Sequence, residues 1–491
     1  MTNVRPGAQL CVTVTADTTA ELRAKRDAAS GADGADLVEL RLDSVRDLSL
    51  EGALADRTCP VLVTCRPAWE GGGFQGSEEE RHGILRRAFA LGADWVDLEW
   101  RGGFDALVAE RQGRNIVLSM HDFDETPDDL EDSYRAMRRT GADVVKMAVR
   151  SQSAGDVVQL LRLGRAARSE RVVLVGMGPA GVATRLLAAH FGSCWSYAGE
   201  GVAPGQVGLS EMVHRYRFKR TTASTAVYGV AGKPIGHSLS PPMHNAGFEA
   251  AGLDAVYVPF EATSTEDLMS LVDALGVTGL SVTAPFKESI LAHVREIDAL
   301  GRRVGAVNTL RADGKEWVGL NTDVPGFLAP LDARGGVGGM RSSVLGTGGA
   351  ARAVAVALAS RGAVVTVCGR RPDRVEAVAR LVGGSAGTLP PSPGSWDLLV
   401  NTTPVGTVPE VTGTPVPAGS LDGGRTVYDL VYNPGTTRLL REAAAAGCDT
   451  IGGLDMLVSQ AVRQFEWWVG SRPSERLFKT AALSVLKEQW A

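Results

Sequence analysis

A lysine lies inside an apolar segment of the first half of the chain. Lys146 interrupts the run DVVKMAV at 143–149 and is one of only eight lysines among 51 basic residues. An ammonium group is costly in apolar surroundings unless it is paired, so burial favours the neutral amine. A neutral amine that faces a pocket can attack a carbonyl group and form a Schiff base. The alternative is a structural lysine that is paired with a carboxylate of the same domain.

Other polar residues lie near the ends of apolar segments in the same half. Glu39 and Arg41 are two residues apart, so in a strand their side chains lie on one face. Arg66, Glu70 and His121 lie at or just after the ends of two further segments. A lone histidine is as often a satisfied core residue as a catalytic one. If the fold brings these five residues and the lysine together at one rim of the domain, however, they would form a catalytic cluster.

The elements that must position these residues alternate between strand-like and helix-like stretches. Eight such units within roughly 210 residues predict a (β/α)8 barrel, whose chemistry lies at the C-terminal ends of the strands. The predicted strands are 10–16, 36–43, 60–66, 95–100, 115–122, 143–149, 171–178 and 193–199.

A pair of hydroxyl residues begins the second half of the chain. Ser238 and Ser240 stand beside His237 after a glycine-rich turn, so several donors could converge on a small anion such as a carboxylate. The alternative is a helix N-cap, because Pro241 and Pro242 suit the first turn of a helix.

A lysine and an aspartate follow two later strands. Lys287 and Asp323 could meet, and an ammonium that is hydrogen-bonded to a carboxylate can give a proton to a developing alkoxide. The alternative is a surface salt bridge.

A glycine-rich turn joins a strand to an alanine-rich helix at 342–358. Its glycines let the backbone approach a pyrophosphate at a helix N-terminus, as in dinucleotide-binding folds. The next strand ends in Arg370 and Arg371, with Arg374 one turn later, where NAD sites usually carry an acidic residue. Guanidinium groups at this place favour a 2′-phosphate and hence NADP, although a solvated basic face is the alternative.

Composition excludes several classes of protein. With 491 residues, 44% of them hydrophobic and 22% charged, the chain is typical of globular protein with two to four domains. A net charge of −5 means that the chain has no excess of positive charge for binding nucleic acid or an anionic membrane. No apolar run approaches the ~18 residues of a membrane span. The six cysteines form no CxxC pair and no metal-ligand spacing. We therefore expect a cytoplasmic protein without a metal.

The first half resembles the type I 3-dehydroquinate dehydratases over 8–215. The motifs that carry the resemblance are ELRLD at Glu39, CRPAWEGG at Cys65, LSMHDF at Leu118, VVKMAV at Val144, MGPAGVATR ending at Arg185 and APGQ ending at Gln206. The resemblance implies an imine between Lys146 and the C3 ketone of 3-dehydroquinate. His121 would remove the C2 proton and then protonate the departing C1 hydroxyl, while Glu70 would orient the imidazole.

The same resemblance assigns the substrate contacts. Arg185 would bind the carboxylate, and the ring hydroxyls would be fixed by Glu39, Arg41, Arg66 and Gln206. Gln206 would lie on a lid. Many family members have a hydroxyl residue where this chain has Val202, so we expect one hydrogen bond from the lid to be missing.

Residues 225–491 resemble the shikimate dehydrogenases. The motifs include GKPIGHSLSPPMHNAGF from 232, GLSVTAPFKE from 279, GLNTDVPGF from 319 and VYDLVYNPGTT from 427. The resemblance implies that Ser238, Ser240 and Tyr432 bind the carboxylate, and that Lys287 and Asp323 form the proton relay. The ring oxygens would be bound by Thr283, Asn308, Asp323 and Gln460. The cofactor contacts would be Gly346, Thr347, Gly348, Gly349, Ala350, Arg370, Arg371, Arg374, Thr402 and Gly453.

Together the two halves imply a bifunctional enzyme. The first would convert 3-dehydroquinate to 3-dehydroshikimate, and the second would reduce that ketone to shikimate with NADPH. The expected domains are the barrel at 1–218, a linker at 219–226, a shikimate-binding lobe at 227–328 completed by 452–491, and a Rossmann lobe at 329–451. The alternatives are a catabolic quinate/shikimate dehydrogenase that uses NAD and a non-catalytic sensor of the same ligands. The sequence leaves the oligomeric state open.

Overall fold

The computed structural model describes residues 7–31, 34–199 and 204–490. The chain divides into two compact units. Unit 1 runs from Met1 to Gly229 and also contains Pro234–Gly236 and Asp254–Val277, and unit 2 contains the remaining residues.

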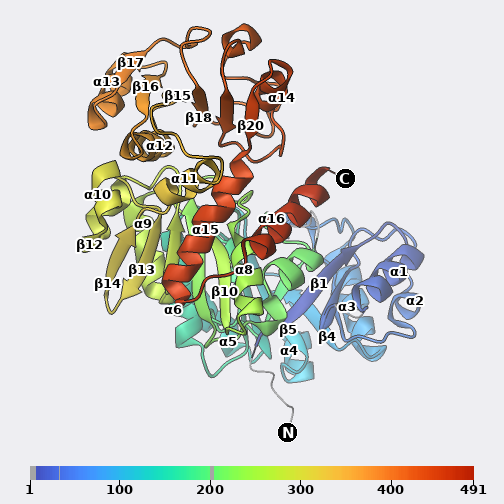
Figure 1. Cartoon of the computed structure of the whole chain (residues 1–491). Helices are drawn as coiled ribbons and strands as arrows, with labels where there is room; N and C mark the ends of the chain where they lie inside the picture. The colour runs from blue at the N-terminus through green and yellow to red at the C-terminus, as the bar shows by residue number, and fades with distance from the viewer. Residues whose placement is uncertain (1–6, 32–33, 200–203, 491) are drawn as a thin grey trace. The chain divides into compact units, whose positions relative to one another are not determined.

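Eight parallel strands of unit 1 form the predicted barrel (Figure 1). Each strand pairs with its neighbours in chain order, and β8 pairs with β1. A single bridge between Val172 and Ser193 joins β7 to the start of β8 and closes the ring. The strands are β1 (Gln9–Thr15), β2 (Leu37–Arg41), β3 (Val61–Thr64), β4 (Trp95–Glu99), β5 (Ile116–Asp122), β6 (Val144–Arg150), β7 (Val172–Met177) and β8 (Trp195–Ala198).

The segments between these strands are mostly helical. They include α1 (Thr19–Ala29), α2 (Leu50–Leu54), the 3-10 turn η1 (Ala68–Glu70), α3 (Glu78–Ala90), α4 (Asp105–Arg111), α5 (Leu130–Arg139), α6 (Ala154–Ala166) and α7 (Val182–Leu186). The strands form near-continuous apolar runs because parallel strands are buried on both faces. Inward-facing residues such as Leu62, Val117 and Val173 fill the barrel core. The (β/α)8 prediction is confirmed.

A later segment of the chain packs within unit 1. It contains β10 (Ala255–Glu261) and α9 (Thr265–Leu275), and α9 packs against α6. The Asp267 carboxylate accepts hydrogen bonds from the backbone N–H groups of Ala154 (3.0 Å) and Gly155 (2.8 Å) at the start of α6. The four-part division of the chain into domains therefore stays a prediction.

A six-stranded sheet of the second half has the order β10-β9-β11-β13-β14-β12. Its other strands are β9 (Ala226–Gly232), β11 (Gly279–Val282), β12 (Glu296–Ile297), β13 (Thr309–Asp313) and β14 (Glu316–Leu320). Within unit 2, β13 runs antiparallel to both β11 and β14. The helices of this part are α8 (Ser240–Ala250), α10 (Ala299–Val304), α11 (Asp323–Asp332), α15 (Gly453–Val469) and α16 (Glu475–Trp490). Phe248, Phe465 and Phe478 join α8, α15 and α16 in one aromatic cluster.

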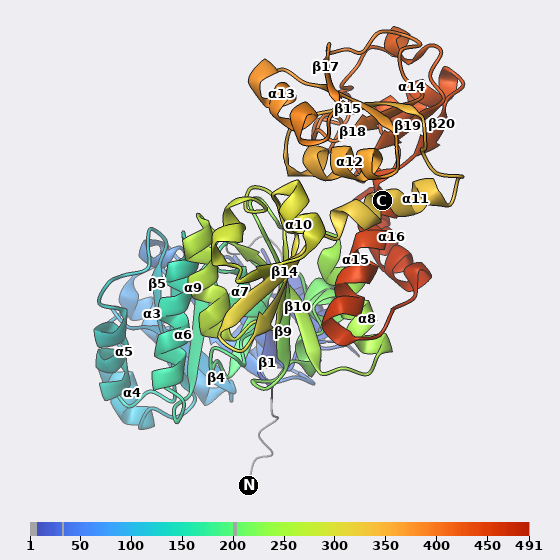
Figure 2. The same cartoon turned by 60° about the vertical axis from the view of Figure 1, so that its left-hand side comes forward.

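The remaining part of unit 2 is a parallel sheet with the strand order β17-β16-β15-β18-β19-β20 (Figure 2). This is the doubly wound order in which dinucleotides bind at the C-terminal ends of the strands. The strands are β15 (Arg341–Leu345), β16 (Val364–Cys368), β17 (Ser385–Gly387), β18 (Leu398–Asn401), β19 (Thr426–Asp429) and β20 (Asp449–Ile451). The accompanying helices are α12 (Gly349–Ser360), α13 (Pro372–Leu381) and α14 (Arg438–Ala445). The Rossmann prediction is confirmed.

In the described part of the chain, no helix combines the length and apolar composition that crossing a membrane requires.

Candidate active sites

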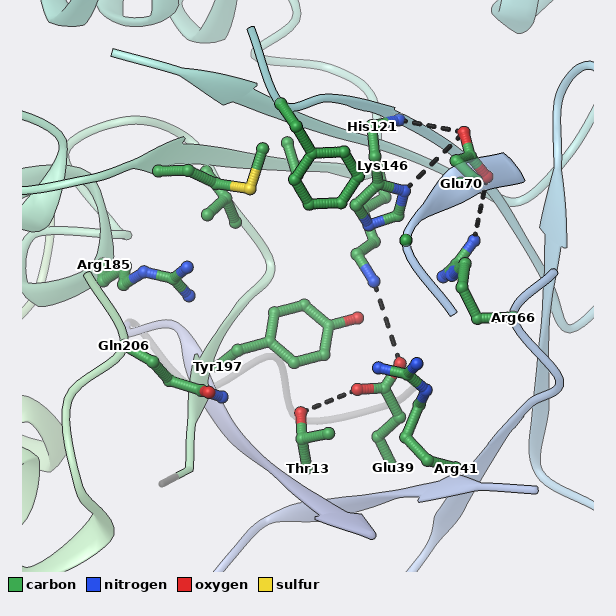
Figure 3. A pocket seen from close by; sticks show the side chains of 15 residues that line it. Thr13, Glu39, Arg41, Arg66, Glu70, His121, Lys146, Arg185, Tyr197 and Gln206 are labelled. Atoms are coloured by element: carbon green, nitrogen blue, oxygen red, sulfur yellow. Dashed lines mark hydrogen bonds and ion pairs between the residues drawn. The ribbon is translucent and has the colours of Figure 1, made fainter. Parts of the chain in front are cut away.

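One pocket of the barrel is lined by all eight of the side chains that the sequence predicted there (Figure 3). They are Glu39, Arg41, Arg66, Glu70, His121, Lys146, Arg185 and Gln206. Most come from the C-terminal parts of the strands or from the segments that follow. Thr13, Phe123, Met177 and Tyr197 also line the pocket and were not predicted. Val202, the predicted lid position, lies outside the described residues.

Lys146 is paired with carboxylates of the barrel, as the alternative interpretation of its apolar strand allowed. Its Nζ lies 3.2 Å from Asp97 Oδ2 and 3.8 Å from Glu39 Oε1. Nζ also lies 4.4 Å from the centroid of the Tyr197 ring. Burial alone would raise the pKa of the Asp97 carboxyl group. The nearby cations Arg66 and Lys146 have a larger opposite effect, so the pKa of Asp97 is well below its usual value. The lysine is therefore paired, because other strands of the barrel supply its inward-facing neighbours.

Arg66 is the centre of a buried network of charges. Its guanidinium donates to Asp97 (2.8 Å), Glu99 (2.8 Å), Glu70 (3.2 Å) and the Ser119 hydroxyl (2.8 Å). Burial opposes its charge, yet Asp97 and Glu99 raise the pKa of Arg66 above its usual value. These contacts occupy the guanidinium, so the arginine holds the carboxylates around Lys146 in place. Its predicted contact with a ring hydroxyl stays a prediction.

His121 and Glu70 lie side by side at the pocket. The backbone N–H of His121 donates to Glu70 Oε1 at 3.0 Å. The imidazole Nδ1 of His121 lies 3.8 Å from the same oxygen. Burial, together with Arg66 and Lys146, lowers the pKa of His121 well below its usual value, so the imidazole is neutral near neutral pH. Burial raises the pKa of Glu70 to about 7, although Arg66 opposes the shift. A neutral imidazole beside a carboxyl group suits a general base.

Arg185 is the cation of the pocket that lacks a counter-ion. Its side chain is buried, and no acidic residue in the described part of the chain forms an ion pair with it. Burial lowers the pKa of Arg185 to about 10. Arg41, by contrast, forms two hydrogen bonds with Asp43, at 2.8 and 2.9 Å. A buried guanidinium without a carboxylate partner is suited to bind the carboxylate of a ligand.

Glu39 is held in place by neighbouring hydroxyl groups. Thr13 and Thr64 donate to its two carboxylate oxygens at 2.7 and 2.8 Å.

Gln206 lies against Gly199, where a Cβ atom on the glycine would come within 2.5 Å of the Gln206 amide nitrogen. A side chain at 199 would therefore displace Gln206.

The second candidate site lies in unit 2. Lys287 Nζ donates to Asp323 Oδ2 at 2.6 Å, and both side chains are mostly buried, so the pair is no surface salt bridge. The Asn308 amide donates to Asp323 Oδ1 at 2.8 Å and to Gln460 Oε1 at 3.4 Å. Gln460 comes from α15, so a C-terminal helix supplies part of this group. Thr283 follows β11, four residues before Lys287.

The two serines stand at the start of α8. Ser238 Oγ accepts a hydrogen bond from the backbone N–H of Ser240 at 3.2 Å. The N-cap residue is Leu239, which makes no side-chain cap, while Ser238 accepts the N–H of the first helical residue, so Ser238 makes the kind of contact that the N-cap alternative predicts. Pro241 and Pro242, the next two residues, have no backbone N–H and therefore need no cap. In the described structure no hydrogen bond joins Tyr432 to either serine, so the predicted help from Tyr432 stays a prediction.

The predicted cofactor residues surround the turn from β15 to α12. Gly346 has φ 120°, and a Cβ atom there would lie 2.4 Å from Thr402 Oγ1. Gly348 is the N-cap of α12, and Thr347 and Ala350 flank the two glycines at its start. A Cβ atom on Gly349 would be 3.6 Å from Lys287 Cδ, so the start of this helix lies beside the lysine.

Three arginines follow the next strand of the Rossmann sheet. Arg370, Arg371 and Arg374 are exposed, and no ion pair joins them to an acidic residue in the described ranges. Their guanidinium groups are therefore available to bind a phosphate group, such as the 2′-phosphate that distinguishes NADP from NAD. The predicted cofactor contact of Gly453 stays a prediction, and a Cβ atom there would lie 2.2 Å from the Leu430 carbonyl oxygen. This glycine allows α15 to begin close to the loop after β19.

Sequence reasoning missed two residues that touch Lys146. Asp97 lies in β4 two residues before Glu99, and Tyr197 lies in β8 two residues after Trp195. The alternation that singled out Glu39 and Arg41 would also have found Asp97 and Glu99, because both pairs have period two in a buried strand. No pattern distinguishes Tyr197 from an ordinary core aromatic residue.

Comparisons with known proteins find relatives of both halves of the chain. Family models match at 10–223 (type I 3-dehydroquinase), 230–310 (shikimate dehydrogenase substrate binding domain) and 453–483 (shikimate 5'-dehydrogenase C-terminal domain). The chain is 33% identical over 485 residues to the chloroplastic bifunctional 3-dehydroquinate dehydratase/shikimate dehydrogenase of Arabidopsis thaliana, covering 91% of this chain and 79% of the relative.

Further similarities cover the second half. A shikimate dehydrogenase (NADP(+)) of Haloarcula marismortui is 44% identical over 258 residues, which are 51% of this chain and 96% of that protein. A crystal structure of a shikimate dehydrogenase in complex with NADP+ has a TM-score of 0.52 and 34% identity, covering 54% of this chain and 97% of the other. The chain belongs to the family of bifunctional 3-dehydroquinate dehydratase/shikimate dehydrogenases.

Proposed function

We propose that the chain converts 3-dehydroquinate to 3-dehydroshikimate in the barrel and reduces this ketone to shikimate with NADPH in unit 2. The observation that carries the proposal is that each half contains a complete set of reacting groups. Lys146, His121 and Glu70 line one pocket, and Lys287 is hydrogen-bonded to Asp323 beside a dinucleotide turn. Both sets are intact, whereas a non-catalytic sensor would not need either of them.

In the barrel, the Lys146 amine attacks the C3 ketone, and the ketone oxygen leaves as water to give an iminium ion. His121 removes the C2 proton, since its lowered pKa keeps the imidazole neutral and able to accept it. The same imidazole then protonates the C1 hydroxyl, which leaves as water, and hydrolysis of the imine releases 3-dehydroshikimate. Arg185 holds the carboxylate of the ring throughout.

Glu70 controls how this reaction depends on pH. Its pKa is raised to about 7 from the usual 4.5, so the carboxyl group becomes protonated below neutral pH and loses its hold on His121. We expect kcat/KM for dehydration to fall about tenfold per pH unit below about pH 7. In Glu70→Gln the rate should be lower and this acid limb should disappear. An acid limb that persists unchanged in the variant would show that another group titrates.

In unit 2, the proposed role of Lys287 is to donate a proton to the oxygen of the reduced ketone. Asp323 keeps the ammonium aimed and helps to re-supply the proton. Asn308, Thr283 and Gln460 bind ring oxygens, while Ser238, Ser240 and Tyr432 bind the carboxylate. NADPH supplies the hydride when it is bound.

The proposed cofactor is NADP rather than NAD. The supporting observation is that Arg370, Arg371 and Arg374 are exposed and available where a 2′-phosphate would lie. The turn with Gly346, Thr347, Gly348, Gly349 and Ala350 would hold the pyrophosphate at the start of α12. Thr402 would lie near the nicotinamide and its ribose.

Removal of two arginines should weaken NADPH binding selectively. We expect Arg370→Ala/Arg371→Ala to raise the Michaelis constant for NADPH roughly 10- to 100-fold, because charged hydrogen bonds to the phosphate are lost. The constant for NADH should change little. Arg380→Ala is the matched control, since Arg380 is exposed on α13 and, among the residues that the structure describes, pairs with Glu376 alone. Wild-type turnover that is equal or faster with NADH would favour an NAD-using catabolic enzyme instead.

Two separate assays test the proposed function. The enone absorbance of 3-dehydroshikimate should appear from 3-dehydroquinate without a cofactor, and NADP+ should be reduced when shikimate is added. Failure of either assay would remove that activity. The expected substrates are small carboxylated rings, and the expected location is the cytoplasm, consistent with six free cysteines.

A further inference from the structure

Tyr197 lines the barrel pocket, although no motif pointed to it. It is the third residue of β8 and only 4% exposed. In Figure 3 its ring lies among the labelled pocket side chains, with Lys146 above it and Glu39 below it in this view. The Lys146 Nζ stands over the ring face, 4.4 Å from its centroid. This distance is within the range of a cation–π interaction.

The contact with Lys146 is made by the ring and not by the phenol oxygen. Within the described ranges the Tyr197 hydroxyl forms no hydrogen bond of ordinary geometry, although the Trp195 side chain lies close to it. Burial, and then the nearby Glu39, raise the pKa of the phenol well above its usual value, so the ring stays neutral at physiological pH. Nζ thus has three stabilising neighbours, of which two are carboxylates at 3.2 and 3.8 Å and the third is an aromatic face.

These neighbours respond differently when the lysine reacts. An ammonium has three N–H donors and can serve both carboxylates at once. Imine formation joins Nζ to C3 and expels the ketone oxygen as water, which leaves one N–H on a planar cation. This cation can donate to only one carboxylate. The aromatic face needs no N–H group, so its attraction to the cation survives the reaction.

We propose that Tyr197 is a further catalytic residue of the dehydratase pocket, whose ring face stabilises the iminium formed on Lys146. The inference rests on the proposed dehydratase function. The residue acts until His121 removes the C2 proton and the iminium becomes a neutral enamine. The ring therefore favours the cationic adduct over the neutral amine and ketone from which the adduct forms.

A series of ring substitutions at position 197 tests the inference. Tyr197→Phe keeps the ring and is the reference. Phenylalanine analogues with one, two or three ring fluorines, incorporated at the same position, weaken the negative ring face at nearly constant shape. We expect the single-turnover rate of dehydration to fall with each fluorine, by roughly 2- to 30-fold over the series. The fraction of enzyme trapped by borohydride with 3-dehydroquinate should fall in parallel.

Two further measurements identify what causes the loss. Tyr197→Leu removes the ring and should lose at least as much rate as the most fluorinated variant. Tyr197→Phe should lose no more than about threefold, because phenylalanine attracts cations only slightly less than tyrosine. Reduction of NADP+ by shikimate in the same samples reports the amount of folded protein, and it should not change.

Each other outcome overturns the proposal. A rate that is independent of fluorination would reduce Tyr197 to a packing residue, since the analogues fill the same space. A loss in Tyr197→Phe as large as in Tyr197→Leu would assign the effect to the hydroxyl group. A wild-type chain that forms no adduct with 3-dehydroquinate would overturn the dehydratase function, and this inference with it.

Discussion

Replacement of Lys146 by alanine is expected to abolish the covalent adduct that borohydride traps with 3-dehydroquinate. The variant should also lose dehydration by at least about a thousandfold, because no other lysine lines the barrel pocket in the described structure. Mass spectrometry of the trapped wild-type protein should locate the adduct on the peptide that contains Lys146. An unchanged adduct in the variant would remove this lysine from the mechanism.

Lys146→Arg is the matched control for charge. Arginine keeps a cation near Asp97 and Glu39 but cannot form an imine, so this variant should be as inactive as Lys146→Ala and more stable to heating. The stability difference follows because alanine leaves two buried carboxylates without their partner. Both variants should still oxidise shikimate with NADP+.

Replacement of Lys287 by alanine should lower kcat for the reduction of 3-dehydroshikimate by about a hundred- to ten-thousandfold, the range typical of a positioned proton donor. The Michaelis constant should change far less, because the proton is transferred only as the alkoxide forms. Steady-state kinetics with NADPH in excess separates the two parameters. An increase in the Michaelis constant alone would make Lys287 a binding residue.

Two controls accompany this prediction. Lys315→Ala removes an exposed lysine in the turn between β13 and β14 and should leave the kinetics unchanged. Asp323→Asn keeps the size of the partner but removes its charge, so it should lower kcat in the same direction as Lys287→Ala. Dehydration of 3-dehydroquinate should be normal in all three variants.

The architecture could be predicted because its signals are local and repeated. Each barrel strand is buried on both faces and therefore forms an apolar run of its own, as Val144–Arg150 illustrates. The turn at Gly346 and the helix that follows were equally clear, since their residue types are required by backbone geometry. The boundaries of the compact units were harder to predict from the sequence, because α9 packs against α6 although more than 100 residues separate them in the chain.

The surroundings of the reacting groups could be predicted less well. The sequence of β6 suggested an apolar environment for Lys146, whereas Asp97 and Glu39 approach it from other strands of the barrel. Residues that are distant in sequence meet there only after the barrel closes. By contrast, the start of α8 could be predicted from local signals, because Pro241 and Pro242 suit the first turn of a helix.

The most direct test of two successive reactions on one chain is a single incubation of the purified protein with 3-dehydroquinate and NADPH. We predict that shikimate accumulates and that one NADPH is consumed for each shikimate formed. Lys146→Ala should form none unless 3-dehydroshikimate is added, and Lys287→Ala should accumulate 3-dehydroshikimate. Shikimate production from 3-dehydroquinate by Lys146→Ala, or none by the wild-type chain, would contradict the account.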